Sequence, residues 1–267
     1  MKKIFGFVFV LVLMLSVSVS AAGEATVYVT VSDGNGVLSL NAERVTVTDI
    51  NNDGILTIDE ALKCTHEQFF DGGAEAGYSS YVGQYGIALD KLWGVSNGGS
   101  YSYYLNNAFA MSMSDAVKDG DYLVAYAYSD LTTWSDVYSF FEEHHVTVES
   151  GESLTLKLMS SGFDENFAPL VLPVKGAVIT FDGEKTEYVT DENGSVTVKL
   201  SAGEHIISAV SEKEVLVPPA CVVTVNAKTY EDAPQTADSS FGIFTVIMAV
   251  TFAATIACFK KKYINEK

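Results

Sequence analysis

Cysteine and positively charged residues are scarce in this sequence, and each shortage excludes a class of protein. Three cysteines in 267 residues are too few for the disulfide framework of many small secreted domains. Cys64 and Cys221 could pair outside a cell, but we favour two buried thiols. Only 16 Lys and Arg stand against 34 Asp and Glu. Because affinity for phosphates comes from basic side chains, this balance argues against nucleic acid and anionic lipid surfaces as partners.

The two ends of the chain predict export and anchoring. Residues 1–22 have a basic start, an apolar stretch and a small-residue end, which is the pattern of a signal peptide. Residues 241–259 are uncharged and long enough for a transmembrane helix, with lysines in the tail at 260–267. The positive-inside rule places that tail in the cytoplasm. We therefore expect residues 23–240 outside the cell; the alternative for 241–259 is a buried core helix.

A polar linker at 227–240 precedes the apolar run. It contains Ala233-Pro234-Gln235-Thr236-Ala237, which resembles the Leu-Pro-x-Thr-Gly sorting signal of Gram-positive wall proteins. The Pro and Thr match, whereas alanines replace the Leu and the Gly. The resemblance implies attachment to the cell wall through a sortase, with retention in the membrane as the alternative. Either outcome predicts a protein on the cell surface.

One segment, 49–60, has a spacing that dictates chemistry. It matches the EF-hand calcium pattern D-x-[DN]-x-[DN]-G-x5-E at every constrained position, with Gly54 at the sharp turn. The expected Ca²⁺ ligands are all oxygens, from Asp49, Asn51, Asp53, the carbonyl of Ile55, Thr57 directly or through a water, and Glu60. A strand-like stretch precedes the loop and no second copy exists. We therefore expect a single strand–loop–helix unit that staples the chain; an ordinary Asp/Asn/Gly turn is the alternative.

The strand and turn signals favour two domains, which are mostly β with one helix in the first. Residues 23–168 read as strands around the calcium loop, with a helix from Ile58 to Phe70 and a loop rich in Gly, Ser and Tyr at 71–100. Residues 169–226 alternate short strands with Asp-Gly and Asn-Gly turns, which predicts a small antiparallel β-sandwich.

Three motifs of the first domain resemble the transcobalamin C-terminal-like family. They are Leu92-Trp93-Gly94, the strand from Ser100 to Asn106 with its Tyr103-Tyr104 pair, and the turn from Val117 to Leu123. The resemblance covers about residues 25–160 and implies a β-grasp-like fold. Family members are implicated in binding corrinoids or other small ligands, so the resemblance implies such a ligand here.

The second domain resembles the carboxypeptidase-regulatory and prealbumin-like sandwich modules of bacterial surface proteins. Its Gly176-Ala177, its Thr190 to Gly194 turn and its Gly203-Glu204-His205 carry that resemblance. It implies a small β-sandwich that serves as a stalk module.

Aromatic residues gather beside the calcium loop. Trp93, Tyr101, Tyr103 and Tyr104 are the candidate ligand-binding residues, because tyrosine offers an apolar face with a polar tip that suits a corrinoid or a glycan. Packing between neighbouring strands is the alternative. Ser96 lies in a Gly-x-Ser-x-Gly match, but turn and strand signals follow it where a nucleophile elbow needs a helix. We therefore expect no enzyme.

The sequence thus predicts a calcium-binding protein of a bacterial cell surface that binds a small ligand or adheres to a surface protein. A structural display protein built of spacer domains is the alternative, and a secreted hydrolase ranks third.

Overall fold

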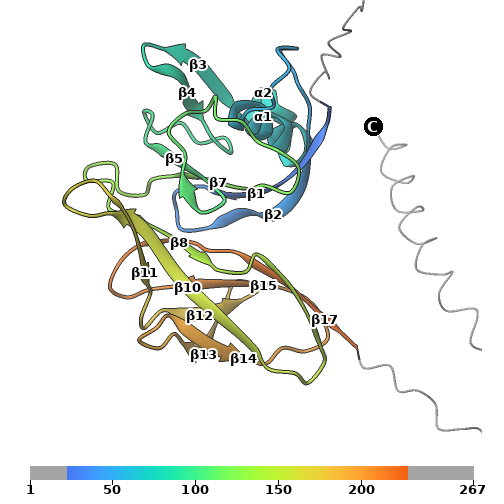
Figure 1. Cartoon of the computed structure of the whole chain (residues 1–267), viewed down its shortest axis with the longest axis vertical. Helices are drawn as coiled ribbons and strands as arrows, with labels where there is room; N and C mark the ends of the chain where they lie inside the picture. The colour runs from blue at the N-terminus through green and yellow to red at the C-terminus, as the bar shows by residue number, and fades with distance from the viewer. Residues whose placement is uncertain (1–22, 228–267) are drawn as a thin grey trace, which may run out of the picture. The chain divides into compact units, whose positions relative to one another are not determined.

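A five-stranded sheet, a two-stranded sheet and two helices build the N-terminal region, residues 25–127. The computed structural model describes residues 23–227, which are mostly β-strand (Figure 1). The elements of the N-terminal region are β1 (Ala25–Ser32), β2 (Leu38–Val47), α1 (Ile58–Phe69), α2 (Gly73–Gly77), β3 (Ser79–Gly83), β4 (Gly86–Lys91), β5 (Tyr101–Leu105), β6 (Ala108–Phe109) and β7 (Tyr122–Ala127). One sheet has the order β2-β1-β7-β5-β6, in which β1 and β7 run parallel.

The helix α1 confirms the prediction for residues 58–70 and covers one face of this sheet (Figure 1). Its start is fixed by a capping box: the Thr57 hydroxyl accepts the Glu60 N–H, while the Glu60 carboxylate accepts the Thr57 N–H. Buried residues of α1, such as Leu62, share a core with alternate residues of β1, such as Val27 and Val29. The period of 3.6 in the helix and of 2 in the strand thus directs both apolar faces inward.

Residues 71–100 differ from the expected loop. They contain the short helix α2 and a two-stranded sheet of β3 and β4. Gly86 has a φ of 116° at the start of β4, where the hairpin turns. Glycine and serine dominate this stretch, so its strands have little of the alternating pattern that identifies a half-buried strand.

The C-terminal region, residues 137–226, is a β-sandwich. Its strands are β8 (Val137–Phe141), β9 (His145–Glu149), β10 (Leu154–Phe163), β11 (Pro169–Pro173), β12 (Val178–Phe181), β13 (Glu184–Val189), β14 (Ser195–Val198), β15 (Gly203–Val210), β16 (Leu216–Val217) and β17 (Cys221–Asn226). One sheet has the order β11-β10-β8-β16, with β14 also paired to β10; the other is β13-β12-β15-β17-β9. Both sheets contribute to one apolar core, as Leu158 and Ile207 illustrate.

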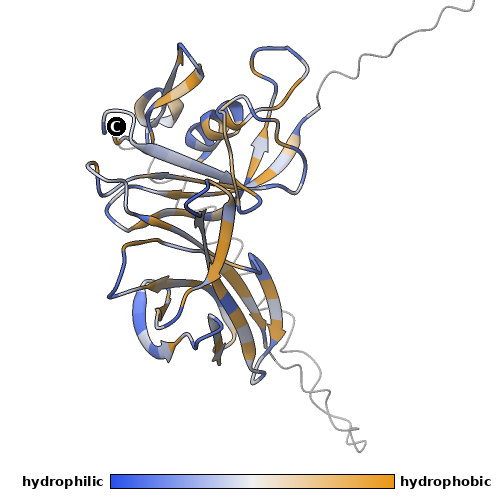
Figure 2. Cartoon of the chain, turned by 60° about the vertical axis from the view of Figure 1, so that its left-hand side comes forward, coloured by the Kyte–Doolittle hydropathy of each residue, from blue (hydrophilic) through white to orange (hydrophobic). Residues whose placement is uncertain are grey.

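Hydrophobic and hydrophilic residues alternate along these strands (Figure 2). In β17 every second residue is buried, while the residues between them are partly or fully exposed. This alternation, which the sequence shows directly, places one face of each sheet against the core.

The strands β8, β9 and β10 pair with the sandwich, although the expected boundary at residue 168 grouped them with the N-terminal region. β10 pairs with β14 from Leu154 to Lys157, and β9 runs parallel to β17. These contacts join strands that are far apart in the sequence. The pattern of apolar residues within one strand does not show which distant strand it will pair with.

A third apolar cluster joins the two regions. Tyr104 and Tyr126 from the first sheet pack with Tyr138, Phe140 and Met159 of the sandwich. The rings of Tyr104 and Tyr138 stack with centroids 3.6 Å apart, and the Tyr138 hydroxyl donates to Asn107 Oδ1 at 3.0 Å. The cluster therefore covers the face of the first sheet opposite α1.

Cys64 and Cys221 are free and buried in separate cores, which confirms the favoured reading of two thiols. Within residues 23–227, neither helix combines the length and the apolar character that a membrane crossing requires. The expected signal peptide at 1–22, most of the linker, the span at 241–259 and the tail lie outside the described residues.

Candidate functional site

The loop between β2 and α1 is organised by its own oxygen-bearing side chains. Asp49 accepts two backbone N–H groups, from Asp53 to Oδ1 at 3.2 Å and from Gly54 to Oδ2 at 2.9 Å. Asn51 Oδ1 accepts the same Asp53 N–H at 2.9 Å. Asp53 Oδ1 in turn accepts the Ile55 N–H at 2.9 Å. Three side chains from alternate positions therefore turn toward the inside of one loop.

Two residues give this loop its sharp bends. Asn52 has a φ of 59° and Gly54 a φ of 87°, both in the left-handed region. Asparagine tolerates that conformation better than most side chains, and glycine adopts it without strain. The glycine of the calcium pattern therefore stands where the backbone needs it.

Glu60 closes the loop from the first turn of α1. Its side chain is buried, with 4% of the residue exposed. Oε1 accepts the Ile50 N–H at 2.8 Å and the Asn51 N–H at 3.3 Å, while Oε2 accepts the N–H and the hydroxyl of Thr57. The carboxylate thus ties the start of the loop to the start of the helix.

Five of the six predicted calcium ligands line one hollow. A cavity of about 300 Å³ is lined by Asn51, Asp53, Ile55, Thr57 and Glu60, the last five of the six expected ligands. Asp49 does not line this cavity, but its Oδ1 shares the Asp53 N–H with Asn51 Oδ1.

The oxygen donors match the preference of a hard cation such as Ca²⁺. Among residues 23–227, however, no three His, Cys, Asp or Glu side chains converge closely enough to hold a metal as they stand. The remaining expected ligands, which are the Asn51 amide, the Ile55 carbonyl and the Thr57 hydroxyl, belong to other residue types. The side chains of Asp49, Asp53 and Glu60 would therefore have to move toward one another to grip an ion.

The loop is connected to a buried aromatic cluster through Asp59. Its Oδ1 accepts the hydroxyl of Tyr78 at 2.6 Å. Burial, with the nearby carboxylate, raises the pKa of Tyr78 well above its usual range, so the phenol keeps its proton and donates. Tyr78 packs beside His66, which is fully buried and lies against Phe70 and Trp93.

Trp93 and Tyr101, two of the predicted ligand residues, hold the chain in place. The Trp93 N–H donates to His66 Nε2 at 2.9 Å, and the indole packs edge-on against Phe70. The Tyr101 hydroxyl contacts the carbonyls of Asp90 and Val95, each at 2.8 Å, and accepts the Asn97 N–H. Tyr101 thereby fixes the 90–97 segment.

Tyr103 and Tyr104 lie on opposite faces of the first sheet. Tyr103 packs partly buried against the core that contains α1, whereas Tyr104, 5% exposed, stacks on the sandwich. Successive residues of a strand point to opposite faces, so both cannot contribute to one platform. The structure therefore does not bring the four predicted ligand residues to a common surface.

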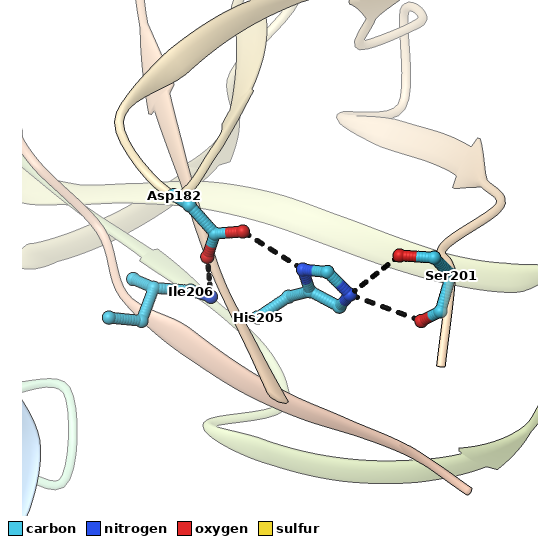
Figure 3. A network of polar contacts seen from close by, with 4 residues as sticks. All are labelled: Asp182, Ser201, His205 and Ile206. Atoms are coloured by element: carbon cyan, nitrogen blue, oxygen red, sulfur yellow. Dashed lines mark hydrogen bonds and ion pairs between the residues drawn. The ribbon is translucent and has the colours of Figure 1, made fainter. Parts of the chain in front are cut away.

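A second polar network, which the sequence analysis missed, lies at two turns of the sandwich (Figure 3). His205 Nδ1 is 2.9 Å from Asp182 Oδ2, and its Nε2 is 3.3 Å from Ser201 Oγ. Asp182 Oδ1 also accepts the Ile206 N–H at 2.8 Å. The histidine lies between the serine and the aspartate, as in a Ser-His-Asp triad. However, 23 residues separate the His from the Asp in the sequence, and no known motif contains them.

The surroundings of His205 argue against a nucleophile. The hydrogen bond to Asp182 raises the pKa of His205, which favours a ring protonated on both nitrogens. Nε2 is also 3.1 Å from the Ser201 carbonyl, an acceptor for that proton. A nitrogen that donates to a carbonyl cannot accept the serine proton, as a general base must. The network therefore ties two turns together.

Comparisons with known proteins do not assign the chain to a family. No family model matches it, and no curated protein matches it. A solved structure of the tandem Ig repeats of Dlar is similar at 13% identity over 57% of this chain and 75% of that chain, with a TM-score of 0.25. So low a TM-score carries no argument about function.

Proposed function

We propose that the chain is a calcium-stabilised binding or adhesion protein of a bacterial cell surface. The loop at 49–60 carries this proposal, because Asn51, Asp53 and Glu60 line one hollow and Asp49 shares a hydrogen-bond donor with Asn51. The acidic composition supports it, since residues 23–240 hold 33 Asp and Glu against 10 Lys and Arg. An acidic surface attracts cations and keeps the protein soluble.

Calcium would act here as a staple between β2 and α1. Glu60 is the third residue of α1 and already contacts the backbone at Ile50. An ion held between Glu60 and the loop oxygens would replace hydrogen bonds within the loop by stronger charge contacts. Extracellular calcium modules bind at about 0.1–1 mM, and a structural role needs no tighter site.

The strand order supports the β-grasp-like fold that the transcobalamin C-terminal-like resemblance implies. The antiparallel pair β1–β2 comes before α1 in the chain, and the antiparallel pair β5–β7 comes after it. The two pairs join into one sheet because β1 and β7 are neighbours and run parallel. A surface location remains part of the proposal, because its signals fall in residues 1–22 and 227–267. Anchoring through a membrane span or a sortase belongs to the same proposal.

A display protein built of spacer domains is the second candidate. The packing of Trp93, Tyr101 and Tyr104 favours it, because residues engaged in the core cannot also receive a corrinoid or a glycan. Fluorescence titration of the protein with a panel of corrinoids and glycans separates the two candidates. Saturable quenching supports binding, and its absence across the panel supports the spacer.

Calcium removal tests the staple. For a Kd between 1 and 0.1 mM, we expect 10 mM Ca²⁺ to raise the free energy of unfolding by about 1.4 to 2.7 kcal/mol, and EDTA to abolish the gain. Thermal unfolding with and without calcium, together with terbium luminescence, provides the measurement. Asp49→Ala should remove the calcium-linked gain.

The matched control is Asp191→Ala. Asp191 Oδ1 accepts the N–H groups of Asn193 and Ser195 in a sandwich turn, so its loss also removes an aspartate that organises a turn. This variant should keep the full calcium response. A wild-type melting temperature that is the same in calcium and EDTA would show that 49–60 is only a turn.

A further inference from the structure

The outer edge of β3 has no neighbouring strand. β3 and β4 form a two-stranded sheet that projects from the N-terminal region as a hairpin (Figure 1). Within the described residues, the backbone of residues 79–83 makes no backbone–backbone hydrogen bond outside this hairpin. One side of β3 therefore presents free N–H and C=O groups, which are a template on which a further strand can pair.

The other edge strands of the described residues carry protection that β3 lacks. β2, β4, β9 and β13 each contain charged side chains, whereas β11 begins and ends with proline. β6 and β16 have only two residues, and both valines of β14 are buried. Charges, prolines and short length are the devices by which proteins prevent pairing at a sheet edge. β3 has the sequence Ser-Ser-Tyr-Val-Gly, with no charge and no proline.

The side chains of this hairpin are apolar and exposed. Val82 is 84% exposed, and Tyr85 at the tip is 95% exposed. Successive residues of a strand point to opposite faces, so Tyr81 and Val82 offer an apolar contact on each face of the sheet. A two-stranded sheet is only marginally stable by itself. A third strand would cover both side chains and add a second ladder of hydrogen bonds.

Charge decides between a second copy of this chain and another protein as the source of that strand. Residues 23–240 contain 33 Asp and Glu against 10 Lys and Arg, so two copies repel each other. Within the hairpin, one acid, Asp90, and one base, Lys91, cancel. The selection therefore comes from the field of the whole region, which attracts a basic polypeptide.

We propose that the outer edge of β3 binds an extended, basic segment of another protein by strand addition. Main-chain hydrogen bonds supply the affinity in complexes of this kind. The edge therefore accepts segments of different sequence, provided that they are extended and positively charged. The proposal rests on the binding function proposed above, for which it names the class of partner and the surface.

Calorimetric titration of the full chain in calcium tests the partner with defined peptides. The probe is acetyl-Lys-Thr-Val-Thr-Val-Lys-amide, whose β-branched residues favour an extended backbone and whose lysines supply the charge. One matched control exchanges both lysines for glutamates. The other carries N-methyl groups on its two central residues, so that a methyl group blocks each of its edges. We expect saturable binding of the probe, and binding at least about tenfold weaker for either control.

Hydrogen exchange and variants locate the site. The probe should slow the exchange of the amides of residues 79–83 and leave those of β11 unchanged. Val82→Pro should abolish binding, and Val82→Lys, which leaves the backbone intact, should weaken it at least about tenfold. The matched control is Val171→Lys, which introduces the same charge at an exposed valine of β11 and should bind like the wild type. Val82→Lys keeps the test valid where proline disturbs the hairpin.

Four results would overturn the proposal. The first three are unchanged exchange of residues 79–83 at the highest probe concentration, equal binding of either control peptide, and wild-type affinity in Val82→Lys. The fourth is dimerisation of the chain through β3 without peptide, detected by sedimentation and by exchange, which would make a second copy the occupant.

Repeating the titration and the thermal unfolding in EDTA separates this proposal from the calcium staple. A calcium response without probe binding rejects the β3 edge alone. Probe binding without a calcium response rejects the staple and keeps the edge.

Discussion

The loop–helix segment at 49–66 and the turns of the sandwich use the same kinds of polar side chain in opposite surroundings. Glu60 and His66 are almost completely buried beside α1. In the sandwich, the Asp182 side chain is 53% exposed and Asp191 lies in an exposed turn. Hydrogen bonds in a dry interior are costly to lose, whereas those at the surface exchange with water. Losing a polar contact should therefore cost more stability beside α1 than at the turns of the sandwich.

Replacing Glu60 should give the largest effect. Glu60→Ala leaves the N–H groups of Ile50 and Thr57 without their acceptor and removes one of the two hydrogen bonds of the capping box of α1. We expect a loss of about 3 kcal/mol in the free energy of unfolding, measured by chemical denaturation in EDTA. Performing the measurement without calcium separates this structural role from metal binding.

The control for Glu60 is Glu192→Ala in the sandwich. Glu192 pairs with Lys175, and both side chains are largely exposed. Exposed ion pairs contribute little, so we expect a change below about 0.5 kcal/mol. Equal losses in the two variants would break the contrast between the buried and the exposed network.

His66 should produce an effect of similar size, but through pH. Burial lowers the pKa of His66 to about 4, although the hydrogen bond to the Leu62 carbonyl opposes the shift. Nε2 accepts the Trp93 N–H, so Nδ1 carries the proton of the neutral ring and donates to that carbonyl at 2.6 Å. Protonation of Nε2 would place its new N–H against the N–H of Trp93.

The sign of the effect follows from these pKa values. The unfolded ring titrates near 6.5, so the unfolded state takes up protons first as the pH falls. The stability from His66 is fully present above about pH 6.5 and is lost progressively down to about pH 4, for a total of about 3 kcal/mol. Unfolding free energies at pH 7, 5.5 and 4 measure this loss. His66→Phe should be less stable at pH 7 but should lose less on acidification; parallel pH profiles would contradict the assignment.

The sequence predicts correctly those features that depend on residues close to one another in the chain. The helix predicted at the end of the 49–60 pattern is present, and it begins at Ile58 as expected. The buried faces of α1 and β1 also follow from the apolar period. These features depend on residues that are neighbours in the chain.

The parts that could not be predicted depend on distant partners. Tyr103 and Tyr104 are chemically alike, and only the sandwich packed against one face of β5 decides which ring is buried there. The hairpin of β3 and β4 lacks an apolar pattern, because it packs little of its surface. His205 meets Asp182 and Ser201 only after β12 and β15 pair, so the spacing of these residues in the chain carries no signal.

His205 should give the smallest effect, with the opposite dependence on pH. Its hydrogen bond to Asp182 raises its pKa above 6.5, so the folded state holds the proton more tightly than the unfolded state. The resulting stability is fully present below about pH 6.5 and is lost as the pH rises through the folded pKa. The ring itself is only 16% exposed, but its partner is open to water, which limits the contribution to below about 1 kcal/mol. His205→Gln should therefore be slightly less stable than the wild type at pH 5.5 and nearly equal at pH 8.5, and NMR titration of the ring should show the raised pKa. A larger loss at pH 8.5 than at pH 5.5 would mean that the neutral ring, rather than the ion pair, joins the two turns.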